Sequence, residues 1–439
     1  MLDIKFIREN IDAVKENSRL RKSSVDIDEI IRLDDGRKTL QAALDGKRAE
    51  LNASSKQKPS PEEISRLKSL GEEIKKLEDE IKTIQGQITD LLSWVPNMSS
   101  PDMPIGAGEH DNPDLKVWTP EDGYLPEEKL GKDTEVAQYM KTKDGQHHVE
   151  LGEALDMIDT KQSALTSGSR FVYLKNDAVL LQYAIFNLLS KKLIEKNFVP
   201  MIPPVLVREK VLFGTSHFPE GKDQVYKIES ENVEEAADLY LVGSSEPSLF
   251  AYHMDKTHSE SDLPYKMFAL TSCFRSEVGS WGKDVRGIKR VHQFDKLEMD
   301  VVCTAEQSEA VMAELLEINE WMLQTLKIPY RVINKCTGDC GYLATYKQYD
   351  VEAWLPSQKE FMEVMTDTNA TDYQSRRLNI RYTKDGEKQY AHTVNDTGVA
   401  MGRLIIAIMD NYQNPDGSIT VPEALKEYMG KDKIVAGSK

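Results

Sequence analysis

The segment FRSEVGSWGKDVRGIKRVHQFDKLEMDV, residues 274–301, decides the fold that the sequence predicts. Its residue types predict two strands joined by a long, basic loop that contains glycine. Because successive strand side chains point to opposite faces, one face should carry Thr271, Cys273, Arg275 and Glu277 from the first strand and His292, Phe294, Lys296 and Glu298 from the second. One side of the sheet would then present an arginine, an aromatic ring and two carboxylates.

Phe294 and Glu298 are separated by about 13 Å along this face, at roughly 3.3 Å per residue. That distance is close to the span of a nucleotide base, its sugar, one phosphate and a small acyl group. The ring at one end suits a purine, and the carboxylate at the other suits an ammonium or hydroxyl group. Arg275 can offer its planar guanidinium to a phosphate or carboxylate between them.

The loop from Val278 to Lys289 carries Lys283, Arg286 and Lys289 among Gly279, Gly282 and Gly287. This composition is typical of a mobile lid over anionic oxygens. A solvated hairpin with surface salt bridges and a basic turn fits the segment equally well. The rest of the chain has to separate these two interpretations.

The whole chain has 439 residues, of which 40% are hydrophobic and 29% are charged. Such a chain can bury a large core and is expected to hold two or three domains. Its formal net charge of −17 argues against nonspecific DNA binding, so any nucleic-acid contact must come from local basic patches. No run approaches the ~18 apolar residues that a membrane helix needs.

The cysteines, Cys273, Cys303, Cys336 and Cys340, follow a charged N-terminal sequence that does not resemble a signal peptide, which indicates a reducing cytoplasm. Cys336 and Cys340 could form half of a metal site. No matching pair of cysteines or histidines lies nearby, so zinc is not expected. His147 and His148 are interpreted as surface residues.

Residues 1–24 are expected to form a short amphipathic helix. After it, apolar residues recur every three or four positions until the break at Lys58–Pro61, and a heptad seam then continues through Leu67, Leu70, Ile74, Leu77, Ile81, Ile84, Ile88 and Leu91. This pattern predicts an antiparallel helical hairpin over about residues 27–92. Basic side chains outnumber acidic ones along its first helix, which makes that helix the candidate for contacting phosphates. A plain packing or dimerisation coiled coil remains the alternative.

A linker rich in proline, glycine and serine, from Trp94 to Gly108, is expected to mark a domain boundary. Residues 177–197 should form a helix that buries Val179, Leu180, Tyr183, Phe186, Leu189 and Leu193. Prolines at 200, 203 and 204 keep the next segment extended and exclude a central position in a sheet. An edge strand is the default, and a subunit interface is the more specific interpretation.

Three further blocks carry candidate site residues. Ser244, Ser245 and Glu246 follow a short strand and suit either a small polar ligand or an ordinary helix cap. Glu363 and Thr366 offer oxygen ligands to a hard cation, although strict alternation puts them on opposite faces unless the strand ends or bulges between them. In TVNDTGVAMGR, a strand should end at Asn395, Thr397 should cap a helix that begins near Gly398, Gly402 should allow close approach, and Arg403 should lie in the second turn.

Together these blocks resemble the three signature motifs of class II aminoacyl-tRNA synthetases: a helix and strand ending at Pro204, a strand-loop-strand with FRSE, and a strand-helix with Arg403. Across nearly its whole length the chain is similar to the seryl-tRNA synthetase family. The matching blocks are HVELGEAL, SGSRF, GSSE, FRSEVGSWGKDVRGIKRVHQFDKLE, the Glu363–Val364 pair, DYQSRR, TVNDTGVAMGR and VPEALKEYMGK.

The resemblance implies an α+β fold, with an antiparallel sheet flanked by helices and an N-terminal helical-hairpin arm that binds tRNA. It implies a tRNA-binding domain over 1–105, a linker and entry over 106–168, a catalytic domain over 169–430 and a tail over 431–439. It also implies a homodimer built on the first motif. In the implied reaction, serine and ATP form seryl-adenylate, and the terminal ribose hydroxyl of tRNA(Ser) then takes the seryl group. Whether selenocysteine tRNA is also charged stays open.

Carried over residue by residue, the resemblance gives catalytic roles to Arg275, Glu298 and Arg403. Serine is expected at Ser244, Ser245, Glu246, Arg275, Glu298, Asn395 and Thr397. ATP is expected at Arg275, Ser276, Glu277, Val291, Phe294, Glu363, Val364, Met365, Thr366 and Arg403. Magnesium would accompany ATP at Glu363 and Thr366.

The chain departs from the family pattern at several of these positions. Val242 stands where a threonine is usual, Ser244-Ser245-Glu246 replaces threonine-alanine-glutamate, and Met365-Thr366-Asp367 replaces serine-serine-cysteine. Thr366 keeps a hydroxyl, so magnesium binding survives in principle. Asp367 does not supply the cysteine of the zinc-dependent subtype. The resemblance does not explain the extra length around residues 129–147.

Two other functions stay open on the residues alone. One is a class II paralogue that activates a small amino acid for a non-tRNA carrier, against which the helical arm argues. The other is a non-catalytic coiled-coil adaptor, which the presence of Arg275, Glu298 and Arg403 disfavours. Pyrophosphate exchange that depends on another amino acid and not on serine would refute the synthetase. Acylation of a carrier without charging of tRNA would support the paralogue, and absence of ATP binding would support the adaptor.

Overall fold

The computed structural model describes residues 1–54, 61–130, 136–229, 239–279 and 286–437. They form two compact units, Met1–Pro96 and Asn97–Lys439. Lys283 and Gly282 of the predicted lid lie outside the described residues. Within the described ranges, no helix combines the length and apolar character that a membrane crossing requires.

The first unit is helical throughout. It contains α1 (Ile4–Glu9), α2 (Ile11–Leu20), α3 (Ile27–Ser54) and α4 (Pro61–Ser93). The single helix expected over residues 1–24 is wrong, because the chain breaks at Asn10. The side-chain amide of Asn10 donates to the carbonyl of Phe6 at 2.9 Å, and such local bonds favour a helix end over helix continuation.

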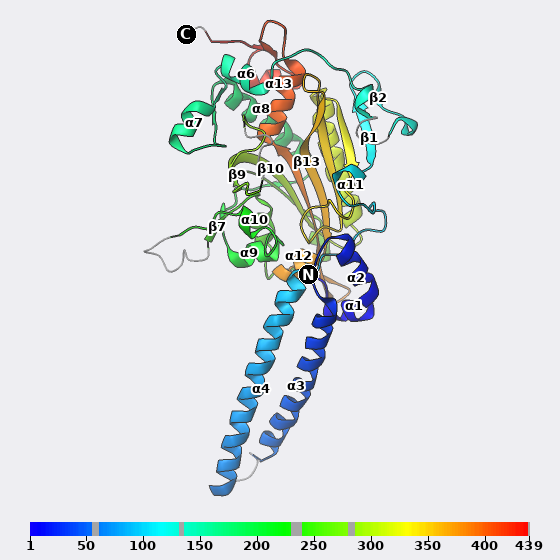
Figure 1. Cartoon of the computed structure of the whole chain (residues 1–439), viewed down its shortest axis with the longest axis vertical. Helices are drawn as coiled ribbons and strands as arrows, with labels where there is room; N and C mark the ends of the chain where they lie inside the picture. Colours follow the sequence, from blue (N-terminus) through cyan, green and yellow to red (C-terminus); the bar gives the residue numbers. More distant parts are fainter. Residues whose placement is uncertain (55–60, 131–135, 230–238, 280–285, 438–439) are drawn as a thin grey trace. The chain divides into compact units, whose positions relative to one another are not determined.

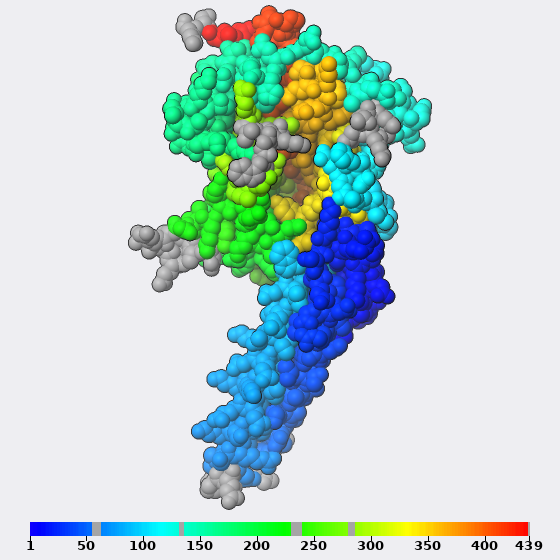
Figure 2. Space-filling model, viewed as in Figure 1, coloured from blue at the N-terminus to red at the C-terminus, as the bar shows by residue number. Residues whose placement is uncertain are grey.

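The predicted hairpin is present, with α3 and α4 lying side by side (Figure 1). Its seam buries Leu44, Leu70 and Ile74, flanked by half-buried Leu51 and Leu77. Figure 2 shows the hairpin as a narrow rod whose side chains stand out along its length. The arm is thus held by one apolar seam, as its heptad pattern indicates.

A buried carboxylate fixes the base of this hairpin. Asp34 on α3 has a fully buried side chain and accepts hydrogen bonds from Arg8 on α1 at 2.7 Å and from Arg37 at 2.7 Å, with Lys38 3.0 Å away. Burial alone would favour its neutral form, but these three cations lower the pKa of Asp34 to about 2. The cluster joins α1 to α3 through charge-assisted hydrogen bonds.

The second unit is built on a sheet that has nine strands among the described residues, in the order β2-β1-β11-β12-β13-β16-β10-β9-β5. These strands are β1 (Asp114–Thr119), β2 (Gly123–Tyr124), β5 (Val199–Pro200), β9 (Tyr265–Phe274), β10 (Gln293–Cys303), β11 (Tyr330–Asn334), β12 (Lys347–Leu355), β13 (Glu360–Thr371) and β16 (His392–Ala400). All neighbouring pairs are antiparallel except β5 with β9. The predicted fold class is therefore confirmed.

Helices cover the two faces of this sheet unequally. The long helices α8 (Asp177–Glu195), α11 (Ser308–Thr325) and α13 (Met401–Tyr412) pack on one face, where Leu297, Met299 and Val301 of β10 join a continuous apolar core. On the other face, three short helices, α9 (Glu209–Gly214), α10 (Glu246–Ala251) and α12 (Tyr373–Leu378), cover only part of the surface. The uncovered part forms the site (Figure 1).

The buried stripe expected on α8 is wrong in part. Leu189 and Leu193 are buried, but Leu180 is 44% and Tyr183 is 54% exposed. The buried positions also include Ala178, Leu181, Ala184 and Ile185. Because α8 is apolar on more than one face, its periodicity does not identify a unique buried stripe. The edge position predicted for the proline-rich segment is confirmed, since β5 is the last strand of the sheet.

Short elements complete the second unit. Two-stranded pairs are formed by β3 (Ile158–Asp159) with β4 (Tyr173–Leu174), β6 (Leu206–Arg208) with β7 (Leu239–Leu241), and β17 (Ile419–Thr420) with β18 (Lys433–Ile434), while β8 (Thr257–Ser259), β14 (Arg381–Lys384) and β15 (Glu387–Tyr390) form a small sheet. The remaining helices include α6 (His148–Ala154), α7 (Thr160–Thr166) and α14 (Lys426–Met429).

The extra length around residues 129–147 packs against β12. Val136 and Met140 are buried in an apolar cluster with Trp354. The indole N–H of Trp354 donates to the carbonyl of Lys141 at 2.7 Å, and Lys143 donates to the carbonyl of Asn411 at 2.7 Å. The described part of this segment is therefore an integral cover of the second unit.

Candidate functional site

A cavity of about 270 Å³ opens on the sparsely covered face of the large sheet. Its walls come from the loop before α10, the hairpin β9–β10, the loop between β11 and β12, strand β13 and the junction of β16 with α13. The lining includes His217, Ser244, Glu246, Arg275, Glu277, Val291, Phe294, Lys296, Glu298, Tyr342, Glu363, Thr366, Gln374, Asn395, Thr397 and Arg403.

The β9–β10 hairpin places its predicted residues on this cavity. Phe294 pairs with Cys273, and Glu298 pairs with Ala269, four residues further along β10. The guanidinium of Arg275 lies 5.4 Å from the centre of the Phe294 ring, and its Nε donates to the carbonyl of Gly243 at 3.2 Å. The expectation that Arg275, Phe294 and Glu298 face one side of the sheet is confirmed.

The first strand of the hairpin is shorter than predicted. β9 ends at Phe274, and Glu277 adopts a left-handed backbone conformation with φ of 52°. Its carboxylate nevertheless lines the cavity and is bound by Arg290. A non-glycine residue at positive φ is uncommon and strained, and such residues cluster at functional sites.

One end of the cavity is rich in buried polar groups. The Glu246 carboxylate accepts a hydrogen bond from Gln374 at 2.7 Å and from Asn395 at 3.4 Å, and Gln374 accepts one from Thr393 at 2.7 Å. Ser244 Oγ accepts from the backbone N–H of Glu246 at 3.2 Å. Burial, followed by the charge of Glu298, raises the pKa of Glu246 to about 7. This end suits a small ligand with a cationic group.

Lys296 and His217 also reach this end. Lys296 Nζ lies 2.5 Å from Glu298 Oε2, and the charge of Glu298 raises the pKa of Lys296 although burial acts in the opposite direction. His217 Nε2 lies 3.8 Å from Glu246 Oε2, and the His217 ring packs 4.7 Å from the Tyr342 ring. Burial lowers the pKa of His217 to about 3, so its imidazole is neutral at physiological pH.

At the other end, a β-bulge brings Glu363 and Thr366 together. β12 pairs Val351 with Met365 but Glu352 with Glu363, which leaves Val364 as the extra residue. Both Glu363 and Thr366 therefore line the cavity. Of the two alternatives that the alternation left open, the bulge is correct and the end of the strand is wrong.

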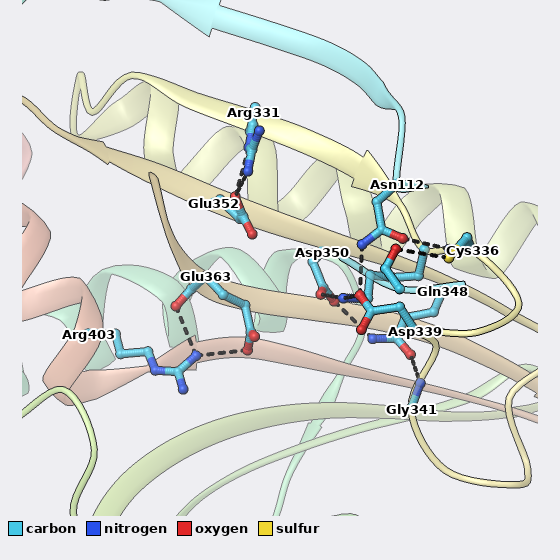
Figure 3. A network of polar contacts seen from close by, with 12 residues as sticks. Asn112, Arg331, Cys336, Asp339, Gly341, Gln348, Asp350, Glu352, Glu363 and Arg403 are labelled. Atoms are coloured by element: carbon cyan, nitrogen blue, oxygen red, sulfur yellow. Dashed lines mark hydrogen bonds and ion pairs between the residues drawn. The ribbon is translucent and has the colours of Figure 1, made fainter. Parts of the chain in front are cut away.

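Arg403 binds Glu363 across the cavity wall. Its Nη1 donates to the Glu363 carboxylate at 2.8 Å and to the Glu363 carbonyl at 3.0 Å (Figure 3). Burial acts against ionisation of Glu363, but the charge of Arg403 outweighs it and lowers the pKa of that carboxyl. Gly402 permits this geometry, since a Cβ there would lie 2.8 Å from the carbonyl oxygen of Ile288.

The start of helix α13 is predicted wrongly. β16 continues through Thr397 to Ala400, which is the N-cap residue, and α13 begins at Met401. Arg403 therefore lies in the first turn rather than the second. Thr397 is a strand residue paired with Glu298, so it reaches the cavity from the sheet and does not cap a helix.

Asp350 does not line the cavity but lies behind its wall beside Glu363 and Thr366, and sequence reasoning missed it. It is buried on β12 opposite Thr366, accepts from the Gln348 amide at 3.0 Å and lies 3.3 Å from Lys335 Nζ (Figure 3). Burial and the charge of Glu363 raise the pKa of Asp350 to about 6. The carboxyl groups of Asp350 and Glu363 are close only because of the register in which β12 pairs with the bulged strand β13. No sequence motif predicts that register.

Four predicted site residues do not line the cavity. Val364 and Met365 are buried in the apolar core on the far face of the sheet. Ser276 donates its hydroxyl to the carbonyl of Asp223 at 2.6 Å, and Ser245 is buried at the N-terminus of α10. Asp367, one of the departures from the family pattern, pairs with Asp396 and is also absent from the lining.

The described part of the predicted lid is tied to neighbouring elements. Lys289 lies 3.3 Å from the Glu360 carboxylate and lines the cavity, whereas Arg286 binds Glu150 at 3.0 Å and does not line it. His148, expected at the surface, is buried and its Nε2 accepts from the backbone N–H of Ile288 at 3.3 Å.

Comparison with known families agrees with this geometry. Residues 226–412, which include most of the cavity, match the tRNA synthetase class II core domain (G, H, P, S and T). Residues 1–99 match the seryl-tRNA synthetase N-terminal domain. The chain is 40% identical to a serine--tRNA ligase of Treponema denticola, over 99% of this chain and 100% of that protein. The chain belongs to the seryl-tRNA synthetase family.

Solved structures of the family extend over the same length. A seryl-tRNA synthetase from Pyrococcus horikoshii complexed with ATP superimposes with a TM-score of 0.87 at 36% identity, covering 100% of both chains. A cytoplasmic serine–tRNA ligase from Naegleria fowleri in complex with AMP gives 0.83 at 29% identity, covering 100% of this chain and 99% of that one. The chain is thus a class II aminoacyl-tRNA ligase that is specific for serine and depends on ATP.

Proposed function

We propose that the cavity binds ATP and L-serine end to end, forms seryl-adenylate with release of pyrophosphate, and then passes the seryl group to the terminal ribose hydroxyl of tRNA(Ser). The observation that carries this proposal is the common orientation of Phe294, Arg275 and Glu298 on one cavity. In this assignment adenine lies against Phe294 and near Glu277 and Val291. Arg275 binds the α-phosphate and the serine carboxylate, and Arg403 binds the γ-phosphate.

The polar end of the cavity would hold the amino acid. Ser244, Glu246 and Glu298 would surround its ammonium group, and Asn395 and Thr397 would lie near its hydroxyl. Buried polar partners discriminate strongly against a substrate that lacks the hydroxyl, because those partners would then be left unpaired. No enzyme nucleophile is needed, since positioning and neutralisation of phosphate charge suffice for this class of transfer.

The residues at the phosphate end fit a magnesium ion that accompanies ATP. Glu363 and Thr366 line the cavity and offer a carboxylate and a hydroxyl, both hard oxygen ligands. The buried carboxyl of Asp350 lies beside them. Magnesium is typically held by one or two carboxylates plus substrate phosphates. When bound there, it would neutralise the charge that develops on the phosphates. Glu363 would have to share its carboxylate between the ion and Arg403.

The partners of the reaction belong to the same proposal. Residues 1–105 would bind tRNA through the helical arm, and residues 106–168 would lead into a catalytic domain over 169–430. Within the predicted tail, 431–439, strand β18 pairs with β17 and Ile434 is buried in the main core, so Lys433–Ile434 belong to the second unit. The enzyme would act in the cytoplasm, and tRNA(Sec) would be a second substrate only if it presents the same features to the arm. Within the arm, Arg48 and Arg66 already pair with Glu78 and Glu50, so phosphates would compete with these exposed pairs.

A homodimer is proposed along the β5 edge of the sheet. Ile202 is 99% exposed just after β5, and Leu180 and Tyr183 on α8 are exposed apolar side chains that the monomer leaves uncovered. Large exposed apolar patches mark protein interfaces. Replacing Ile202 and Tyr183 by lysine should shift the mass in light scattering from a dimer to a monomer. A wild-type monomer would refute the assignment.

The test of the function is amino-acid-dependent exchange of pyrophosphate into ATP across a panel of amino acids, with the full-length enzyme. Exchange should depend on serine, with alanine and threonine giving at least about 100-fold less. Charging of tRNA(Ser) with radiolabelled serine should follow. Exchange that requires a different amino acid, or serine activation without any charging of tRNA, would contradict the proposal.

A further inference from the structure

Three carboxyl groups meet around one ammonium group beneath the polar end of the cavity. Glu298 and Asp300 alternate on the same face of β10, and Glu246 begins α10, which packs on that strand. We refer to Glu246, Glu298 and Asp300 as the acid trio. Lys296 is its ion-pair partner, at 2.5 Å from Glu298. The exposed fractions are 6% for Glu246, 2% for Glu298 and 0% for Asp300.

Asp300 has no part in the function proposed above, and it does not line the cavity. Neither of its carboxylate oxygens has a hydrogen-bond partner among the residues that the structure describes. An ionised carboxylate that is buried without a partner is strongly destabilising, so such a group takes up a proton or faces a cation. Asp300 is therefore a buried titratable group that calls for an explanation.

The surroundings of Asp300 contain more acid than base. Lys296 and Glu298 lie on the same strand as Asp300, and Glu246 lies on α10; the charges of all three act on Asp300. Asp300 pairs with Met267 of β9 and with Asn395 of β16. The ring of His253 lies against the sulfur of Met267 at 3.2 Å. Burial lowers the pKa of His253 to about 3, so this ring is neutral. His217, next to Glu246, is neutral for the same reason. Of the cations, Lys296 acts on all three members of the trio, and Arg275 acts on Glu246.

Asp300 and Glu246 consequently hold protons more tightly than separate, exposed carboxyl groups would. Burial, then the charges of Glu298 and Glu246, raise the pKa of Asp300 well above its ordinary value. Burial and Glu298 likewise raise the pKa of Glu246 to about 7. Interacting carboxyls titrate together, so the extra proton belongs to Asp300 and Glu246 jointly rather than to one of them.

We propose that the acid trio releases a proton when the ammonium group of the amino acid binds. The inference rests on the proposed placement of serine beside Glu246 and Glu298. The ammonium brings a second positive charge to the trio, and the proton that had compensated the surplus carboxyl leaves to solvent. The balance is one serine bound as its zwitterion and up to one proton released, with no bond formed or broken within the substrate.

This coupling gives serine binding a definite pH dependence. Below the apparent pKa that Asp300 and Glu246 share, the protonated form must lose its proton to bind serine, so the affinity for serine rises with pH. The dissociation constant should fall by up to about tenfold per pH unit in this range and level off above it. Free serine keeps both of its charges over the range, so the dependence would report the protein.

The test is isothermal titration of serine into the full-length enzyme at pH 7, in phosphate and in Tris buffer, whose ionisation enthalpies differ. The difference in heat should correspond to release of about 0.5 to 1 proton per serine. Adenosine is the control ligand, because it has no ammonium group and should release none. Serine affinity measured at pH 6 and pH 8 should differ by about tenfold.

A pair of variants separates Asp300 from a general effect of a buried acid. Asp300→Asn should reduce proton release to less than about half and flatten the pH dependence to within about twofold. Asp367→Asn is the matched control: Asp367 is also fully buried, with neither carboxylate oxygen hydrogen-bonded among the described residues, but the charges that act on it are those of Glu309 and Lys347 rather than of the trio. It should keep the wild-type proton release. Melting temperatures of both variants establish that they are folded.

Each outcome has a distinct meaning. Serine that binds the wild type with no proton release, or with an affinity independent of pH, overturns the coupling but leaves the serine site intact. Full release retained in Asp300→Asn overturns the role of Asp300. Absence of serine binding, with binding of another amino acid, would overturn the proposed function itself. If Asp300→Asn does not fold, the wild-type titration still decides the proposal.

Discussion

The arm and the cavity use charge in opposite ways. Along the arm, ion pairs such as Lys47 with Glu73 and Arg48 with Glu78 are solvent-exposed, and the apolar seam holds the helices together. In the cavity, charged groups such as Lys296 and Glu298 are buried. Exposed pairs contribute little and exchange partners easily, whereas buried ones fix a geometry at a cost in desolvation. The arm is thus suited to an exchangeable contact with phosphates, and the cavity to a fixed ligand.

The largest effect should come from removing the half-buried arginine of the cavity, Arg275. Arg275→Ala removes the guanidinium that is positioned by Phe294 and Gly243, and it should lower serine-dependent pyrophosphate exchange by about 1000-fold or more. Ser276→Ala is the control, because Ser276 follows directly but does not line the cavity. If Arg275→Ala kept pyrophosphate exchange within tenfold of the wild type, the cavity would not be the site of serine activation.

The next effect should be confined to the arm. Joining Leu40 to Ile84 through a short glycine-serine turn removes the outer hairpin and keeps the Asp34 cluster at its base. Charging of tRNA should fall by at least about 100-fold because the phosphate contacts are lost. Pyrophosphate exchange should stay within about twofold. Normal charging by this shortened enzyme would refute the arm as the tRNA-binding element.

Magnesium dependence tests the phosphate end of the cavity. Glu363→Gln removes the carboxylate held by Arg403, and Thr366→Val removes the hydroxyl from the bulged strand while keeping its shape. Each should raise the magnesium concentration needed for half-maximal exchange by about 10- to 100-fold. Chelation with EDTA should abolish exchange in the wild type. An unchanged magnesium requirement in both variants would be evidence against this site.

The buried acid at the base of the arm gives a smaller effect, on stability. Asp34→Asn leaves Arg8, Arg37 and Lys38 without their shared carboxylate and should destabilise the α1–α3 contact by about 2 kcal/mol. Because its folded pKa of about 2 lies below the unfolded value, the stabilisation is present above about pH 4 and is lost as pH falls toward 2. Hydrogen exchange of α3 measures both changes. Equal protection in variant and wild type would contradict the role of the cluster.

The smallest effect is expected at an exposed pair of the arm. Lys47→Gln breaks the ion pair with Glu73, whose side chain is 52% exposed, and should change the hydrogen-exchange protection of α3 far less than Asp34→Asn does. The same variant removes a positive charge and should weaken tRNA binding most at low salt. If Lys47→Gln reduced the hydrogen-exchange protection of α3 as much as Asp34→Asn does, exposed and buried charges would not differ in their contribution to stability.

Sequence reasoning succeeded where a single period determines the structure. The heptads of the arm correctly place Leu70 and Ile74 in one buried seam. The alternation along β10 correctly places Phe294 and Glu298 on the face of the sheet that carries the cavity. The α8 stripe failed at Leu180 and Tyr183, because a helix that is apolar on several faces has no single period to follow. Periodicity therefore identifies a face only when the other faces are polar.

The errors at the cavity have a different cause. The sequence Asn395–Gly398 has turn-like residues, yet pairing of Thr397 with Glu298 and of Ala400 with Lys296 extends β16 past it. Sheet pairing overrides local propensity. Sequence reasoning missed Asp300, Asp350 and His217. Their positions depend on strand register and loop geometry, and neither produces a periodic pattern of residues that can be recognised in a single sequence.

A crystal structure with a non-hydrolysable seryl-adenylate analogue tests the central claim most directly. The adenine ring should lie against Phe294, the phosphate mimic should contact Arg275, and the ammonium group should lie within hydrogen-bond distance of Glu246 or Glu298. An analogue bound in the reverse direction, or bound with its ammonium group away from both carboxylates, would contradict the account.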